Sequence, residues 1–189
     1  MPLPTPIPAW ITALDDRKPW IDVLDGKKLP YTAGEMMHGV LVLRIATQLD
    51  DWSTGRDDRG VVAVRVRYYF ERHDGMWSAL MPDVCYMSWA RFPKHDLSEE
   101  SQRPRIAPDI AVEVLSRKDR PALIRRKVET FLEYGATAVL VLQPETRRVT
   151  VHRAGGASEE RDARGTMPLE PYADLVLDWD EIFAKIGRR

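Results

Sequence analysis

One carboxylate lies inside a run of residues that is otherwise apolar enough to form a buried strand. Glu113 is the fourth residue of the hexamer Ile-Ala-Val-Glu-Val-Leu at positions 110–115. Moving an ionised carboxylate into an apolar interior costs several kcal/mol unless the group is paired with a cation, protonated or bound to a metal ion. Glu113 therefore predicts a site at which one of these three compensations operates.

Two further acids open stretches that have the pattern of strands. Pro82-Asp83 and Pro108-Asp109 each precede a short apolar run, which is typical of a strand entry. Along one strand, Asp109 and Glu113 would stand about 13 Å apart, too far to share a metal ion. Adjacent strands lie only about 4.8 Å apart, so Asp83 is the better partner for Glu113. Asp109 is expected to cap the strand entry or to act as an accessory group.

A lysine falls on the apolar stripe of the helix that should follow this strand. Pro121 begins the predicted helix, Asp119 is its candidate cap and Gly135 marks its end. The helix should fold back over the strand, which would bring an inward Lys127 near Glu113. The alternative is that the lysine stem extends past the stripe to water. The stripe consists of Leu123, Ile124, Val128, Phe131 and Leu132.

Basic residues are concentrated around the start of the same helix. Between positions 117 and 127 there are six basic residues and one acid, although the net charge of the whole chain is −1. A solvated helix face would explain such a cluster as well as a surface for nucleic acid does. The residues expected to contact nucleic-acid phosphates are Arg117, Lys118, Arg120, Arg125 and Arg126.

Two acids, a lysine and a basic helix are the parts required for metal-dependent hydrolysis of phosphodiester bonds. Carboxylates from two strands, Asp83 and Glu113, would hold Mg²⁺ or Mn²⁺ through oxygen. The metal would polarise the phosphate and lower the pKa of a bound water. Lys127 would orient that water or balance the developing charge, and the basic residues would bind flanking phosphates.

Length and composition predict one cytoplasmic domain. The chain has 189 residues, 44% of them hydrophobic, which suits one core; we expect a Pro-containing arm over residues 1–19 and a single domain over 20–189. Cys85 is the only cysteine, which excludes an internal disulfide and a Cys-based zinc site and fits a reducing compartment. No apolar run approaches the roughly 20 residues of a membrane helix, so we expect a soluble protein.

Hydrophobic periodicity predicts the remaining elements. The expected elements are two short extended stretches around Gly26 within Trp20–Tyr31, a helix over Met36–Trp52, a strand over Val61–Phe70, a strand pair over Thr137–Leu142 and Arg148–His152, and a short helix over Asp178–Ile186.

The motifs in this order resemble the Uma-two family of restriction-endonuclease-like proteins, a branch of the PD-(D/E)xK nuclease superfamily. The matching segments are Met37-His38-Gly39, Met81-Pro82-Asp83-Val84, Pro108 to Ser116, Arg126 to Gly135 and Val139 to Pro144. The resemblance implies an α/β fold with a central mixed sheet flanked by helices and an additional β-rich N-terminal part. It also implies Asp83 and Glu113 as metal ligands and Lys127 as the catalytic lysine.

The resemblance is incomplete at one position of the motif. The superfamily's usual lysine, two residues after the acid, would fall on Leu115, and the family resemblance places this role on the following helix, at Lys127. It further implies an accessory acid or polar group near the first helix, for which Glu35 and His38 are candidates. Both could instead be helix-entry or packing residues.

The predicted function is that of a DNA endonuclease, with a homodimer expected by analogy because two-strand cutting favours paired sites. Two alternatives stay open at the level of sequence. One is a catalytically silent nuclease-fold protein that binds nucleic acid or a protein partner, because fold does not guarantee chemistry. The other is an enzyme of the same fold that acts on RNA or on repair intermediates.

Overall fold

A six-stranded mixed sheet forms the centre of the protein, seen here in a computed structural model that describes residues 5–15, 21–30, 36–55, 58–92, 102–156 and 158–184. Its strand order is β10-β9-β8-β7-β6-β3, in which only β7 and β8 run parallel. The strands are β3 (Gly60–Val64), β6 (Val84–Ser88), β7 (Ile110–Val114), β8 (Ala138–Gln143), β9 (Arg148–Arg153) and β10 (Ser158–Asp162).

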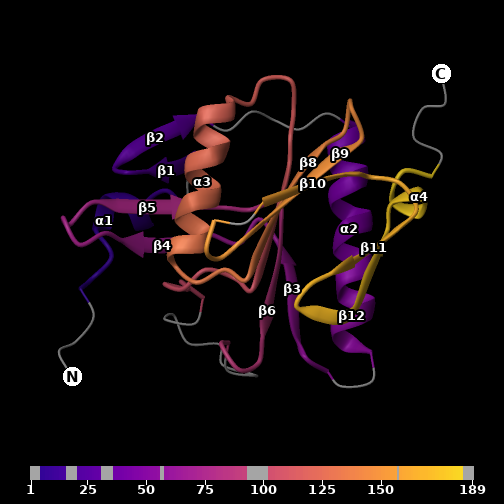
Figure 1. The fold of residues 1–189 in the computed structure, drawn as a ribbon. Coiled ribbons are helices and arrows are strands. Elements are labelled where there is room, and N and C mark those ends of the chain that lie inside the picture. The colour runs from indigo at the N-terminus through magenta and orange to yellow at the C-terminus, as the bar shows by residue number, and fades with distance from the viewer. Residues whose placement is uncertain are drawn as a thin grey trace.

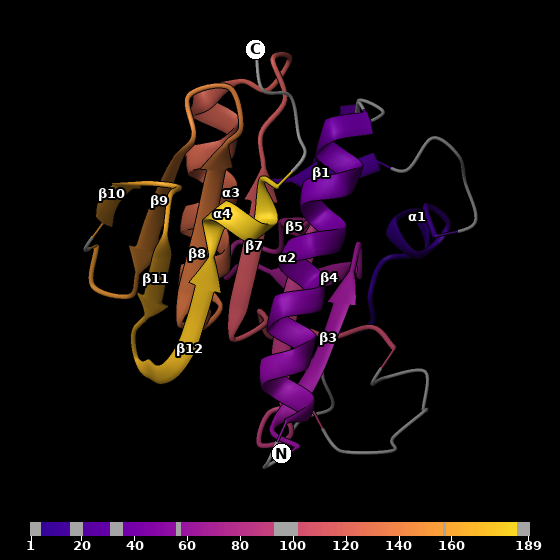
Figure 2. The same cartoon turned by 90° about the vertical axis from the view of Figure 1, so that its right-hand side faces the viewer.

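Two further layers cover the faces of this sheet (Figure 1). One face packs against α2 (Met36–Thr54), α4 (Trp179–Ile182) and the strand pair β11 (Thr166–Leu169) and β12 (Tyr172–Asp178). Figure 2 looks onto this layer, with α2 lying across the sheet. The opposite face packs against α3 (Pro121–Glu133) and residues of the second sheet.

The second sheet has four antiparallel strands in the order β2-β1-β5-β4. They are β1 (Ile21–Leu24), β2 (Lys27–Pro30), β4 (Tyr68–Glu71) and β5 (Trp77–Leu80). The short helix α1 (Ala9–Thr12) lies against it, because Ile11 is fully buried in a cluster with Tyr69 and Trp77. The arm predicted over residues 1–19 thus includes a packed helix, and the predicted division into an arm and one domain stays a prediction.

Burial on both faces of the sheet explains why every residue of β7 except Glu113 is apolar. All five of its residues are buried, and alternate side chains point to opposite faces of a strand. Ile110, Val112 and Val114 join the cluster on the α2 side, whereas Ala111 joins the cluster on the α3 side. Glu113 shares the face of Ala111 and therefore points toward α3.

Most of the predicted elements are confirmed, including the hairpin around Gly26, the helix that starts at Pro121 and the pair β8–β9. The single strand predicted over Val61–Phe70 is wrong. The chain breaks at Arg65, which has a φ of 55°, so that β3 joins the six-stranded sheet and β4 joins the four-stranded one. A positive φ at a residue other than glycine is a local conformation that alternation of residue types does not reveal.

The predicted helix cap at Asp119 is also wrong. The capping position of α3 is Arg120, which makes no side-chain cap hydrogen bond. Asp119 Oδ2 instead accepts hydrogen bonds from the backbone N (2.6 Å) and the hydroxyl (2.8 Å) of Ser116. The carboxylate therefore closes the turn that joins β7 to α3. Within the described residues, no helix is long and apolar enough to cross a membrane.

Candidate active site

Asp83 and Glu113 come together from two neighbouring strands. In the antiparallel pair β6–β7, Val84 lies opposite Val112, and continuing this register by one residue sets Asp83 opposite Glu113. The ladder itself ends at Val84, because Asp83 N donates out of register to Val112 O (3.0 Å), while the Asp83 side chain turns to β7 and its Oδ2 accepts a hydrogen bond from Val114 N (2.9 Å). Both carboxylates are buried. The structure thus brings together the acid pair expected from strand spacing.

Lys127 points inward from α3 and reaches this acid pair. Its Nζ lies 2.7 Å from Glu113 Oε1, and the residue is only 8% exposed. The alternative in which the lysine stem extends to water is therefore wrong. Lys127 lies on the apolar stripe of α3 together with Val128 and Phe131. These two side chains pack on the face of the sheet that carries Ala111.

Asp22 is a member of the site that the sequence interpretation missed. It lies on β1, and its Oδ2 is 3.1 Å from Lys127 Nζ. Its other oxygen accepts a hydrogen bond from Met81 N (3.0 Å), so the carboxylate is fixed at both ends. The sequence could have indicated Asp22, because it is a lone acid in the apolar run Ile-Asp-Val-Leu at positions 21–24. Glu113 was identified from the same kind of pattern.

His38 contacts Asp83 from α2, the helix on the opposite face of the sheet from α3. It lies in the first turn of α2, with Nε2 3.2 Å from Asp83 Oδ2. Its buried Nδ1 has no hydrogen-bond partner within the described part of the chain. The predicted accessory role of His38 is thus compatible with its place in the structure. Glu35, the other candidate, lies outside the described residues.

Asp109 takes no part in this cluster. Its Oδ2 accepts a hydrogen bond from Ser88 N (2.8 Å), and its Oδ1 lies 3.4 Å from the Arg91 guanidinium. Both contacts are at the far end of β6 from Asp83. Asp109 therefore lies at the strand entry, away from the acid pair, and the accessory role predicted for it stays a prediction.

Burial and charge act in opposite directions on the ionisable groups of the cluster. Burial raises the pKa of Glu113 above its ordinary range, against the lowering effect of the Lys127 ammonium. Burial alone would lower the pKa of Lys127, but the negative charges of Asp22, Glu113 and Asp83 outweigh it and raise that pKa. The hydrogen bond with Asp83 raises the pKa of His38. Lys127 is therefore held as a cation.

The cluster opens into a pocket of about 420 Å³. The residues Asp22, His38, Asp83, Glu113 and Lys127 all line it, so the five ionisable groups of the cluster face one space. Cationic side chains also line the pocket: Lys28, Lys118 and Arg120.

The five predicted phosphate-binding residues divide into two groups. Lys118 and Arg120 line the pocket with the acids. The other three do not line it. Arg117 pairs with Glu145, Arg126 with Asp25 and Glu129, and Arg125 lines a second pocket on the other flank of α3.

The donor atoms of the acid pair fit a hard divalent cation. Mg²⁺ commonly takes one or two protein carboxylates and completes its coordination with water and substrate oxygens. Asp83 Oδ1 and Glu113 Oε2 make no hydrogen bond or ion pair within the described residues. In the same part of the chain, no group of three or more His, Cys, Asp or Glu side chains is arranged to hold a metal ion. The described part of the chain thus offers the carboxylates of Asp83 and Glu113 as ligands.

Fold and site together define an α/β protein of the restriction-endonuclease-like class. A solved structure described as "a putative nuclease belonging to DUF820 from Anabaena variabilis" superposes with a TM-score of 0.75 at 20% sequence identity, and the match covers 90% of this chain and 96% of that one. At this identity the likeness concerns the fold.

The family model of Uma2, described as "Putative restriction endonuclease", matches residues 9–179. The chain therefore belongs to the Uma2 family, as its motifs indicated, and family and fold support a nuclease in general terms. No curated protein matches the chain.

Proposed function

We propose that this protein is a metal-dependent endonuclease that hydrolyses DNA phosphodiester bonds. One observation carries the proposal: Asp83, at the start of β6, and Glu113, on β7, line one pocket with Lys127, whose Nζ stands 2.7 Å from Glu113. Two carboxylates and a buried cation in one pocket are the groups that stabilise a phosphoryl group under attack by water.

Each residue of the cluster has a distinct task in the proposed reaction. Asp83 and Glu113 hold Mg²⁺ or Mn²⁺, which when bound supplies Lewis-acid stabilisation of charge on the scissile phosphate. Lys127 presents ammonium protons to the attacking water or to a phosphoryl oxygen. Asp22 fixes the ammonium, and His38 fixes the carboxylate of Asp83. Lys28, Lys118 and Arg120 bind the neighbouring phosphates of the strand.

The test compares cleavage of supercoiled plasmid and single-stranded DNA in Mg²⁺, Mn²⁺ and EDTA. Asp83→Asn, Glu113→Gln and Lys127→Met should each lower the cleavage rate by about 100-fold or more, and EDTA should abolish it. Glu133→Gln is the matched control, because Glu133 is an exposed acid on α3. Equal cutting by the wild type and the three variants, or no metal binding in calorimetry, would refute the proposal.

A catalytically silent nucleic-acid-binding protein is the second candidate. It is favoured by the way the buried charges already compensate one another, since Lys127 pairs with both Glu113 and Asp22. It predicts that wild-type protein binds DNA without cutting it in either metal.

RNA of the same sequence, included in the assay, tests the substrate class. Sedimentation of the wild type tests the homodimer that two-strand cutting would favour.

A further inference from the structure

A second pocket, of about 380 Å³, lies beside the candidate active site. Helix α3 separates the two, because Leu123 and Lys127 line the first pocket whereas Arg125 and Val128 line the second. They share a wall made of Leu115, Ser116, Asp119 and Ile124. A nucleotide next to a phosphate held in the first pocket would thus have the second pocket as its neighbour.

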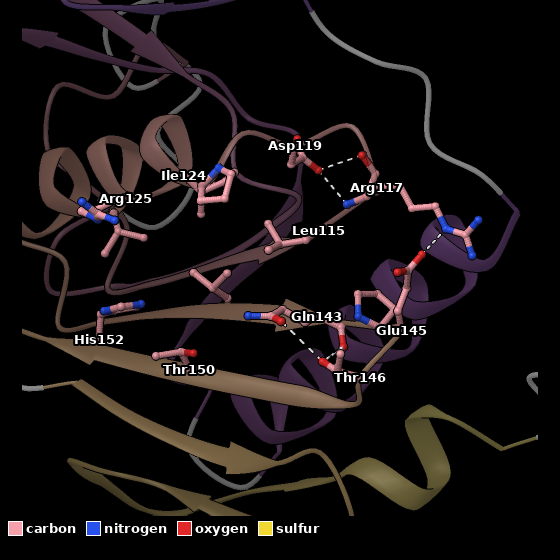
Figure 3. Close-up of a pocket in the computed structure, with 15 residues that line it drawn as sticks. Leu115, Arg117, Asp119, Ile124, Arg125, Gln143, Glu145, Thr146, Thr150 and His152 are labelled. Carbon is pink, nitrogen blue, oxygen red and sulfur yellow. Dashed lines mark hydrogen bonds and ion pairs between the residues drawn. The ribbon is translucent and has the colours of Figure 1, made fainter.

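The second pocket exists because α3 covers the sheet only in part. In the register of β8 and β9, Val141 lies opposite Thr150, and Val139 lies opposite His152, so these side chains share the face on which α3 lies. Thr150 and His152 are half-buried. Figure 3 shows them on the strand next to Gln143, on the side of the sheet that faces Ile124 and Arg125.

The lining combines apolar walls and neutral hydrogen-bonding groups with four charged residues, Arg117, Asp119, Arg125 and Glu145. Gln143 offers a donor and an acceptor, Thr150 a hydroxyl and His152 an imidazole. Burial lowers the pKa of His152, which favours its neutral form. The apolar part of the lining consists of Leu115, Pro121, Ile124, Val128, Val141 and Pro144.

Such a lining suits a flat, uncharged ring with hydrogen-bonding groups on its edge. Apolar walls contact the faces of the ring, and an amide, a hydroxyl and an imidazole satisfy its edge. Of the charged residues at this pocket, Arg117 pairs with Glu145 and Asp119 accepts hydrogen bonds from Ser116, whereas Arg125 supplies a cation that suits a phosphate attached to the ring. Enzymes that act on nucleic acids hold unstacked bases in pockets of this chemistry, with hydrogen bonds to the base edge.

We propose that the second pocket binds an unpaired nucleobase of the nucleic-acid strand whose phosphate occupies the candidate active site. This inference rests on the proposed function for the position of the strand. It names Gln143, Thr150 and His152 as the groups that contact the base edge. The pocket would thus select strands that are single-stranded or locally opened.

Binding measured in EDTA tests the inference without cleavage. The probes are a short fluorescent single-stranded DNA and a fluorescent abasic strand with the same sugar–phosphate backbone. The variant Gln143→Leu/Thr150→Val removes polar edge groups while keeping side-chain size. It should bind the base-containing strand about tenfold more weakly than the wild type does and should bind the abasic strand equally. Thr166→Val, at an exposed position of β11, is the matched control.

A second measurement needs no substitution in the pocket. In the wild type, the imidazole proton resonances of His152, assigned with His152→Gln, should shift when the base-containing strand is added and not when the abasic strand is added. Equal affinity of wild type and double variant for the base-containing strand, or an unmoved His152 signal, would overturn the inference. Deoxynucleoside monophosphates that bind as tightly as the strand would also overturn it, in favour of free nucleotides.

The inference and the proposed function fail in different ways. If the wild type cuts DNA but the double variant keeps its base-dependent affinity, only the base pocket is wrong. If the wild type neither cuts DNA nor binds metal, the proposed nuclease is wrong. A base-dependent loss of affinity in the double variant would still support the pocket in that case.

Discussion

The charges of Glu113, Lys127 and Asp22 are each buried, and each is compensated by another member of the group. The Lys127 ammonium lies within 3.1 Å of both carboxylates. Removing one partner of a buried ion pair is more costly than removing both, because the remaining charge keeps its desolvation penalty. Single substitutions in this group should therefore lower the free energy of unfolding strongly. A double substitution should cost less than the sum of the two single ones.

Lys127→Met should destabilise the fold by about 3–5 kcal/mol, because it leaves Glu113 and Asp22 buried without a cation. Adding Glu113→Gln should recover part of this loss, since one of the two uncompensated charges is then gone. Urea unfolding of the wild type, both single variants and the double variant gives the coupling free energy. Costs that simply add would show that the two side chains do not interact.

Asp22→Asn should lower kcat for DNA cleavage by about 10- to 100-fold and leave KM nearly unchanged. The asparagine oxygen can still accept the hydrogen bond from Met81 N, but it no longer holds the ammonium of Lys127 by charge. Steady-state kinetics checks the split between kcat and KM, and urea unfolding checks that less stability is lost than in Lys127→Met. A rise in KM alone would assign Asp22 to DNA binding instead of positioning.

The alternation of side chains along strands and the periodicity of the helix were sufficient to predict which residues would come together in the candidate site. Glu113 was a lone acid in a buried strand, Asp83 opened a similar strand, and Lys127 lay on an apolar stripe. Asp22 was missed for a physical reason. Its strand has only four residues and belongs to a separate sheet, whose docking beside α3 depends on contacts distant in sequence.

Among the elements, the turn between β1 and β2 ties the four-stranded sheet to α3. Asp25 in this turn accepts hydrogen bonds from Arg126 Nε (2.9 Å) and Nη2 (3.1 Å) and from Arg72 Nη1 (2.9 Å). Because Lys127 follows Arg126 directly, this contact also holds the part of α3 that carries the lysine. The residue pattern predicted the turn, but it could not predict which helix the turn would touch.

Asp25→Asn should weaken this contact without disturbing the turn, because asparagine tolerates the positive φ of 48° found at Asp25. We expect a loss of about 1 kcal/mol at neutral pH, as for a partly exposed ion pair. The hydrogen bond from Arg126 lowers the pKa of Asp25 from its ordinary 3.8. The contribution of ionised Asp25 to the free energy of unfolding is thus fully present above pH 3.8. It is lost as the pH falls through the lower pKa of Asp25 in the folded state.

Urea unfolding of the wild type and Asp25→Asn as a function of pH checks this expectation. The difference in free energy of unfolding should be constant near neutral pH and should shrink in acid. Asp74→Asn is the control, because among the described residues Asp74 forms an ion pair with Arg72 and none with α3. A difference that persists at the most acidic pH at which the protein folds would exclude the ion pair as its cause.

Element boundaries were predictable where periodicity and turn residues agreed, as at Pro121 and Gly135, which has a φ of 97°. They were not predictable where one segment serves two sheets. Alternation of Val62, Val64 and Val66 indicated one strand, yet the chain turns at Arg65 and leaves the six-stranded sheet. Which sheet each half joins is decided by partners elsewhere in the chain, β6 for β3 and β5 for β4.

For the molecule as a whole, strand β6, which lies next to the edge strand β3 of the six-stranded sheet, is enclosed on every side. Strand β6 is hydrogen-bonded on both sides, to β3 and β7, and packed layers cover both of its faces (Figure 1). Cys85 in the middle of β6 is 2% exposed, and it is the only cysteine of the chain. Its thiol is therefore a natural reporter on the opening of the whole sheet.

Cys85 should react with a thiol reagent only when the protein unfolds globally. Burial raises the pKa of its thiol to about 11, so the reactive thiolate is scarce at neutral pH even before access is considered. The logarithm of the labelling rate should then rise with urea with the slope of the unfolding free energy measured by tryptophan fluorescence. Cys85→Ser/Thr47→Cys, with the thiol at an exposed position of α2, should label rapidly and without dependence on urea. Labelling of Cys85 that is fast in native buffer and independent of urea would instead show that β3 separates from β6 locally, and that the three layers do not unfold as one unit.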